Sequence, residues 1–138
     1  MILFIMLFQF FTQLAHAEIT SEHFVVVGNH NKNMISIREH KVETGKGFSA
    51  IRSIEGGRTT GHTLSENRYI ELKRDLDKAI KPMKQTDVRR IASCDDEILV
   101  GSKAPKGPTG LNRVCLSQEA AESRKAMVDW IKKVSRDL

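Results

Sequence analysis

The pattern of apolar and polar residues divides the chain into an apolar leader, several strand-like runs and two helix-like segments. Residues 2–11 are almost unbroken apolar sequence and lead into Ala15-His16-Ala17. An apolar core followed by small residues around one variable position is typical of a secretory signal peptide and its cleavage site. The pattern therefore predicts a signal peptide over residues 1–17 and a mature chain over residues 18–138. The apolar core is too short for a membrane-spanning helix, which needs about 20 residues. No lysine or arginine opens this leader, so an uncleaved segment is the alternative.

Strand-like patterns follow the leader. Phe24–Val27 is a β-branched run that ends at a turn-rich cluster, and Ile35 and Ile37 alternate with polar residues. Together these segments predict a β-hairpin. Residues 46–54 predict a third strand, with a bulge at residues 50–51, where the alternation slips.

Two longer segments show the three- and four-residue apolar spacing of an amphipathic helix. The first follows the glycine-rich residues 55–61, which predict a loop, and Thr63 or Ser65 is its candidate N-cap. Pro82 marks its end, and the second helix is predicted to begin at Ser117. The apolar faces comprise Tyr69, Leu72, Leu76, Ala79, Ile80 and Met83 in the first helix, and Ala120, Met127, Trp130, Ile131, Val134 and Leu138 in the second.

Between the two helices the sequence predicts three further strands, Val88–Cys94, Glu97–Val100 and Leu111–Leu116, and a loop over Gly101–Gly110. The whole pattern predicts a single α+β domain, with a mainly antiparallel β-sheet and two α-helices packed on one face. The order of three strands and a helix occurs twice, so a duplicated βββα unit is a further hypothesis.

The charge balance argues against a nucleic-acid partner. The chain carries 22 Lys and Arg against 17 Asp and Glu, a net charge of +5, and the basic residues are spread along the sequence and mixed with acids. Nucleic-acid proteins instead gather basic residues on one face. We expect no nucleic-acid partner and no stable membrane insertion after signal cleavage. A weak attraction to anionic polymers or lipids stays open.

Two cysteines bear on localisation. Cys94 and Cys115 are the only ones in the chain, and exported proteins fold in oxidising compartments. An even count of two predicts one intramolecular disulfide. The alternative, a reactive thiol pair, usually has the Cys-x-x-Cys spacing that is absent here. We therefore expect a periplasmic or secreted protein.

Catalytic and metal-binding motifs are missing from the sequence. His23, His30, His40 and His62 lack the spacing of zinc motifs, and Asp95-Asp96-Glu97 lacks the pattern of a calcium loop. The sequence therefore predicts a non-enzymatic binding protein without metal or cofactor. A small secreted hydrolase that uses His62 with a nearby Ser or Asp is the alternative of a different class.

Two surfaces are candidates for binding. The first lies in the Pro- and Gly-rich loop, whose candidate contact residues are Lys103, Ala104, Pro105 and Lys106. A bridge at the base would pre-order this loop and lower the entropic cost of binding. The second is a candidate anion site ahead of the first helix, where backbone N–H groups attract anions; it comprises Gly56, Gly57, Arg58 and His62. A plain connecting segment is the alternative interpretation of each.

The element order from residue 46 onward resembles that of emfourin-type inhibitors of thermolysin-like metalloproteases. The resemblance rests on Gly45-Lys46-Gly47-Phe48-Ser49-Ala50, on Leu64-Ser65-Glu66 and on Val128-Asp129-Trp130-Ile131. The chain departs from that family in its glycine pair, its disulfide and its long loop. The resemblance implies protease inhibition, with an extracellular protease as the partner. An envelope-associated protein that binds anionic polymer or lipid is the alternative.

Overall fold

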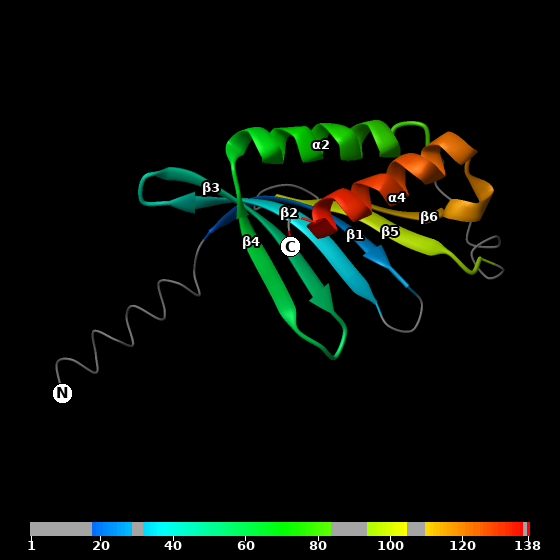
Figure 1. Ribbon diagram of the computed structural model, residues 1–138, viewed down its shortest axis with the longest axis horizontal. Helices are drawn as coiled ribbons and strands as arrows, with labels where there is room; N and C mark the ends of the chain where they lie inside the picture. Colours follow the sequence, from blue (N-terminus) through cyan, green and yellow to red (C-terminus); the bar gives the residue numbers. More distant parts are fainter. Residues whose placement is uncertain (1–17, 29–31, 84–93, 105–109, 137) are drawn as a thin grey trace.

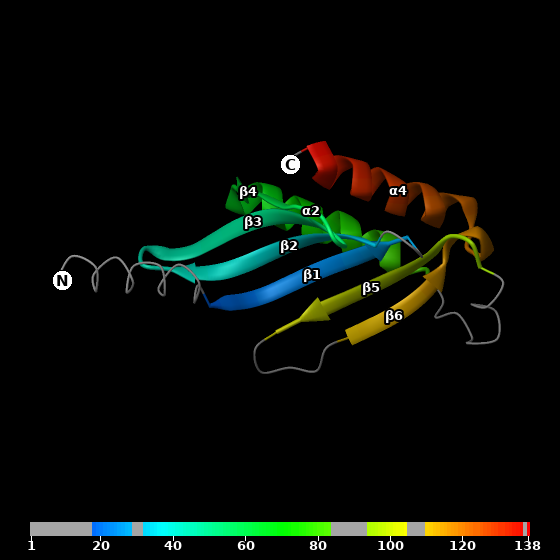
Figure 2. The same ribbon diagram turned by 90° about the horizontal axis from the view of Figure 1, so that it is seen from below.

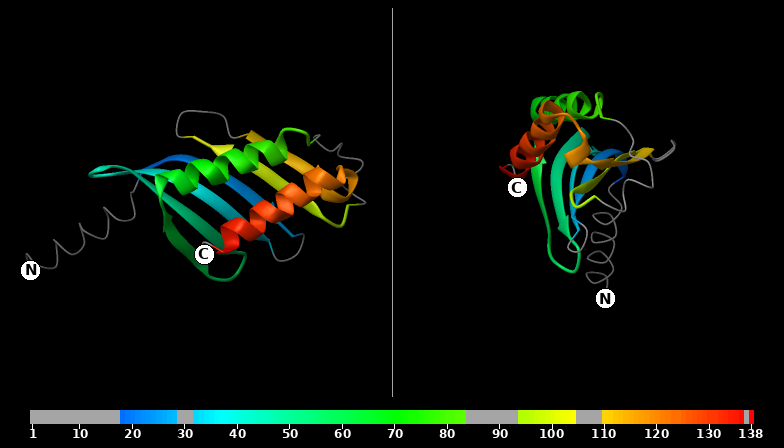
Figure 3. Two further views of the ribbon diagram at one scale, coloured as in Figure 1. Left: turned by 45° about the horizontal axis from the view of Figure 1, so that its top comes forward. Right: turned by 90° about the vertical axis from the view of Figure 1, so that its right-hand side faces the viewer.

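The structure is a computed structural model, and it describes residues 18–28, 32–83, 94–104, 110–136 and 138. Within these residues, one antiparallel sheet contains β1 (Ile19–Val27), β2 (Asn33–Val42), β3 (Gly45–Ile54), β4 (Thr59–Leu64), β5 (Glu97–Lys103) and β6 (Gly110–Cys115). Two α-helices, α2 (Glu66–Ile80) and α4 (Ala121–Arg136), lie side by side on one face of the sheet (Figure 1 and Figure 3). A short 3-10 helix, η1 (Leu116–Gln118), precedes α4. The predicted α+β fold is confirmed.

The first strand of the chain lies inside the sheet, not at its edge. The order across the sheet is β4-β3-β2-β1-β5-β6, because β1 to β4 form a meander and β5 then pairs with the free side of β1 (Figure 2). At the centre, Val25 lies opposite Ile35 on one side and Val100 on the other. This pairing leaves β4 and β6 as the two edge strands.

The helices cover the apolar face of the sheet, and the predicted helix faces are confirmed except at Ala120, which is exposed and precedes α4. Tyr69, Leu72, Leu76 and Ala79 are buried in α2, and Met127, Trp130 and Val134 are buried in α4. The Trp130 indole N–H donates to the Leu72 carbonyl oxygen at 2.8 Å. A buried indole needs such a partner, so this bond fixes how the two helices pack together.

The N-terminus of α2 is capped as predicted. Ser65 is the N-cap, and its Oγ accepts a hydrogen bond from the backbone N–H of Arg68 at 3.2 Å. The helix ends at Ile80, two residues before Pro82, which agrees with the prediction.

The predicted loop over residues 55–61 is wrong in its second half. Only residues 55–58 form the turn, where Gly56 has a φ of +72° that favours glycine. The next residues form β4, which pairs in register with β3. The threonines of β4 are β-branched and suit an edge strand, and this strand-forming tendency outweighs the single glycine at Gly61.

The bulge predicted at residues 50–51 is also wrong. Ala50 and Ile51 pair in unbroken register with β2 and β4. The two residues point to opposite faces of the sheet, where Ala50 is buried and Ile51 is half-buried, so two consecutive apolar residues need no slip in the alternation. The register shift in the described sheet lies instead between Ile19 and Ser21.

The start of the last helix needs a correction. Ser117 lies in η1, and α4 begins at Ala121. The backbone N–H of Ser117 is bound by the Asp96 carboxylate at 3.1 Å, so the chain turns at Ser117 before the helix starts.

The hypothesis of a duplicated βββα unit does not match the first half of the chain, because four strands precede α2. Val88–Cys94, the predicted first strand of the second half, lies outside the described residues except for Cys94. The predicted signal peptide, residues 1–17, lies outside them too. In the part of the chain that the structure describes, no helix is long and apolar enough to cross a membrane.

Candidate functional site

The predicted disulfide is present. Cys94 and Cys115 are joined with a Cα–Cα distance of 5.9 Å, and both residues are buried. Cys94 comes just before β5, and Cys115 is the last residue of β6, opposite Glu97 in the register. The bridge therefore closes the base of the β5–β6 hairpin, at the end away from the loop that joins these strands.

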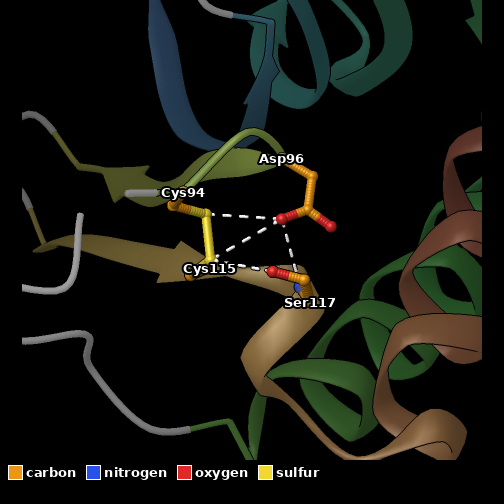
Figure 4. Close-up of a disulfide and its surroundings, with 4 residues drawn as sticks. All are labelled: Cys94, Asp96, Cys115 and Ser117. Carbon is orange, nitrogen blue, oxygen red and sulfur yellow. Dashed lines mark hydrogen bonds between the residues drawn. A yellow bond between two sulfur atoms is a disulfide. The ribbon is translucent and has the colours of Figure 1, made fainter. Parts of the chain in front are cut away.

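Asp96 lies directly beside this bridge (Figure 4). Its Oδ1 is 3.3 Å from the Cys94 sulfur and 3.6 Å from the Cys115 sulfur, and it accepts the Ser117 N–H at 3.1 Å. Oxidised sulfurs carry no proton, so the two sulfur–oxygen approaches are polar contacts in the disulfide state. The Ser117 hydroxyl lies 3.2 Å from the Cys115 sulfur and can donate to it. A single carboxylate thus ties the start of β5 to the end of β6.

The negative charge of Asp96 affects the chemistry of the bridge. Thiol–disulfide exchange begins with attack by a thiolate anion on a sulfur. A carboxylate this close to both sulfurs repels an incoming thiolate and disfavours the departing one. The spacing of Asp96 two residues after Cys94 is the sequence signal for this contact.

The predicted loop over residues 101–110 is wrong at both ends, because residues 101–103 belong to β5 and Gly110 to β6, which pair as a ladder. Lys103 and Ala104 are exposed, and the Lys103 ammonium lies 5.8 Å from the centre of the Phe24 ring. This cation–π contact holds the end of β5 against β1. Pro105 and Lys106 lie outside the described residues, so their role as contact residues stays a prediction.

The charges around this end of β5 are arranged in pairs. Lys103 lies opposite Glu22 in the register of β1 and β5. Glu22 is buried and binds Arg38, with 2.6 Å between Nε and Oε2. The Glu22 carboxylate therefore has its cationic partner on β2, whereas the exposed Lys103 ammonium lies against the Phe24 ring.

The residues of the candidate anion site are separated by the fold. Gly56, Gly57 and Arg58 belong to the turn between β3 and β4, whereas α2 begins at Glu66 after the whole of β4. His62 lies in the middle of β4, opposite Ala50. The glycine turn therefore does not sit at the helix N-terminus, and the geometry on which the anion site was predicted is wrong. The cause is the unpredicted strand β4.

His23 departs from the surface position expected for the histidines. It is half-buried on the helix-facing side of β1, and its Nε2 lies 3.3 Å from the Ser21 hydroxyl. Burial lowers the pKa of His23, and the nearby Lys73 ammonium lowers it further. Burial also raises the pKa of Tyr69, and a side-chain hydrogen bond with the same serine opposes this shift. Alternation along β1 could have placed His23 on the face of Val25, but only the packing of α2 shows that it is covered.

The hydrolase alternative finds no support from His62. This histidine is exposed, and in the described part of the chain it makes no hydrogen bond to a serine or an acid. His40 is half-buried, and its ring lies next to Gly47. His30 lies outside the described residues.

The open face of the sheet carries a hollow that the sequence did not predict. It has a volume of about 240 Å³, and it is lined by Val26, Gly28, Lys32, Glu97, Leu99 and Arg113. Its floor is apolar, because Val26 and Leu99 are direct cross-strand neighbours. Glu97 and Arg113 form an ion pair at 3.6 Å on the rim. Val26 lies in β1, Leu99 in β5 and Arg113 in β6, so the sheet register brings these three residues together.

A network of charges joins the two helices on their solvent side. The Lys133 ammonium of α4 binds Glu71 at 2.7 Å and Asp75 at 2.8 Å, both on α2. The hydrogen bonds that Lys133 donates to Asp75 and Glu71 raise the pKa of Lys133, and the bond to Glu71 lowers the pKa of that acid. The network holds α4 in register with α2.

Comparisons of the chain with protein-family models, with curated proteins and with solved structures find no match. The resemblance to emfourin-type inhibitors stays a prediction from the sequence.

Proposed function

We propose that this chain is an exported, non-enzymatic binding protein that inhibits an extracellular protease with the loop between β5 and β6. The observation that supports this most is the position of the disulfide. It closes one end of the β5–β6 hairpin, and the loop leaves the other end.

The hairpin has the properties that a presented loop needs. Its two strands pair continuously from Glu97 opposite Cys115 to Ser102 opposite Gly110. Because β6 is an edge strand, no further strand of the described sheet covers its outer side. The cation–π contact of Lys103 anchors the first residue before the loop. A loop held at both of its ends loses less conformational entropy when it enters a protease cleft.

The periplasm or the extracellular medium is the proposed location. Disulfides persist in oxidising compartments and are rare in the cytosol. The apolar leader over residues 1–17 has the pattern of a secretory signal peptide. Both features agree with a protease as the partner.

The test combines recovery of a partner with a measurement of inhibition. Oxidised mature protein is used to recover partners from the native periplasm or culture supernatant, and any recovered protease is assayed with increasing amounts of the protein. We expect dose-dependent inhibition that the double variant Lys103→Ala, Lys106→Ala weakens at least tenfold. The variant Lys125→Ala, Lys132→Ala loses the same charge from exposed positions on α4 and should inhibit like the wild type. Equal inhibition by both variants, or recovery of polysaccharide alone, would contradict the proposal.

One observation favours the alternative partner, an anionic polymer or lipid. The outer surface of α2 forms a shallow hollow around Ile70, which is 44% exposed, and its other lining residues are Lys73, Arg74, Asp77, Lys78 and Lys81. An exposed apolar side chain among basic residues suits the interface of an anionic membrane. Sedimentation with anionic and neutral vesicles separates the two functions. Polymer or lipid binding should weaken steeply with salt and respond to Lys73→Glu with Lys78→Glu, whereas loop inhibition should not.

A further inference from the structure

The bridge region contains the donor set of a metal site. The sulfurs of Cys94 and Cys115 and a carboxylate oxygen of Asp96 lie within 4.8 Å of one another. We propose that, once the disulfide is reduced, these three side chains bind a thiophilic divalent cation, with Zn²⁺ as the preferred ion. Two thiolates and one carboxylate are ligands that Zn²⁺ accepts in proteins.

The two oxygen–sulfur distances in the oxidised structure already suit tetrahedral coordination, and the sulfur–sulfur distance can do so after reduction. With Zn–S bonds of about 2.3 Å and a Zn–O bond of about 2.0 Å, an oxygen and a sulfur on one tetrahedron lie about 3.5 Å apart. Asp96 Oδ1 lies 3.3 Å from the Cys94 sulfur and 3.6 Å from the Cys115 sulfur. Reduction frees the two sulfurs to move apart to a non-bonded separation, while the carboxylate needs little movement. Water or an exogenous ligand completes the tetrahedron on the side of Asp96, which is exposed.

Backbone contacts hold the carboxylate in place for this role. The Ser117 N–H donates to Asp96 Oδ1 at 3.1 Å, and the Leu116 N–H donates to the Asp96 carbonyl oxygen at 3.4 Å. The Ser117 hydroxyl, 3.2 Å from the Cys115 sulfur, can donate to a thiolate there. Such outer contacts orient metal ligands and stabilise their charge. The contacts that tie β5 to β6 in the oxidised protein therefore also position the ligands in the reduced one.

The redox step balances with a dithiol as reductant. The dithiol is oxidised to its own disulfide and delivers two electrons and two protons, so that the Cys94–Cys115 bond breaks and two thiols form. Binding of the cation then releases both thiol protons to solvent, because the ligands are thiolates. The cation replaces the covalent link at the same place in the fold, and a disulfide-forming oxidant would expel it.

The test uses Co²⁺ as a spectroscopic probe of the full mature chain after reduction by a phosphine and removal of the reductant without air. We expect one equivalent of Co²⁺ to produce thiolate charge-transfer absorption and the visible bands of a tetrahedral site, and Zn²⁺ to bleach them. Asp96→Asn keeps an oxygen that accepts the Ser117 N–H but removes the charged ligand, so it should weaken Co²⁺ binding at least about tenfold. Asp95→Asn is the matched control, since Asp95 is the exposed neighbour, and it should bind like the wild type.

Folding is followed in the same samples by Trp130 fluorescence. If reduction alone unfolds the chain, one equivalent of Co²⁺ or Zn²⁺ should restore the native emission, and a failure to do so overturns the proposal. The proposal is also overturned if Asp96→Asn binds Co²⁺ as tightly as the wild type. The same holds if Asp96→Asn and Asp95→Asn lose equal amounts of Co²⁺ affinity. Tight Co²⁺ binding by the oxidised protein would show that the cation binds outside the cysteine site, and this result would also overturn the proposal.

Discussion

The Cys94–Cys115 bridge should contribute a large part of the stability of this fold. It joins residues 21 positions apart, and the chain-entropy treatment of a loop of that size gives about 3 kcal/mol of stabilisation. The perturbation is the double variant Cys94→Ala, Cys115→Ala. Alanine is the better replacement, because Cys115 is fully buried and a serine hydroxyl there would need a new partner.

The assay is urea unfolding of the oxidised mature protein, followed by the fluorescence of Trp130, the only tryptophan of the chain. This residue is 2% exposed between the helices, so its emission reports loss of the packed core. A loss of about 3 kcal/mol should move the midpoint down by about 1–3 M urea, given the usual slopes for small proteins. A typical domain is stable by about 5–15 kcal/mol, so the variant should still fold.

The reduced wild-type protein provides the second arm of this experiment. Without metal ions it should lose about as much stability as the double variant, since both lack the same cross-link. If the oxidised wild type and the double variant unfold at the same urea concentration, the entropic argument is refuted. If the double variant loses stability but the reduced wild type does not, the loss is instead due to the cavity that the missing sulfurs leave.

Three further predictions concern the helices and the sheet. Burial lowers the pKa of His23 below its unfolded value of 6.5, so the unfolded state takes up the proton first. Stability should therefore fall as the pH drops below about 6.5 toward the folded-state pKa, and urea unfolding of His23→Gln between pH 5 and pH 8, at about one-unit steps, should show a flatter profile. Lys133→Ala removes the link to two acids of α2 and should lower the melting temperature by about 2–4 °C at low salt. Lys132→Ala, which faces solvent, should leave it unchanged, and equal effects of the two changes would contradict the network. A Cβ on Gly47 would meet His40 Nε2 at 2.6 Å, so Gly47→Ala should destabilise by about 1 kcal/mol. In a His40→Ala background only the 3.1 Å approach to Val42 Cγ1 is left, so the same change should cost less stability, and an equal loss in both backgrounds would count against the His40 contact.

The features that could be predicted from the sequence are those with a local physical cause. The period of the apolar residues places Tyr69, Leu72 and Leu76 on one face of a helix whatever the helix packs against. Ser65 caps that helix because a hydroxyl before the first turn can accept a backbone N–H. The disulfide followed from the count of cysteines and the expected compartment.

The sequence predictions were wrong where contacts with neighbouring strands decide the local structure. The threonines of β4 form an edge strand only because β3 offers them a ladder of hydrogen bonds, and a glycine-rich segment by itself reads as a loop. Missing that strand also misplaced Gly56, Arg58 and His62 at the helix start. Likewise, Ser117 has the residue type of a helix cap, but Asp96, 21 positions earlier, binds its N–H.

The sequence by itself thus determined the helices, the core faces and the pairing of the cysteines, because each depends on short-range spacing or on composition. The tertiary structure decided which polar groups meet. It set Asp96 against both sulfurs, His23 beneath α2, Lys133 between two acids, and Val26 beside Leu99 at the floor of the open-face hollow. These contacts join residues distant in the chain, and their register follows from how the whole sheet pairs. The proposed binding hairpin and the proposed metal site both depend on that register.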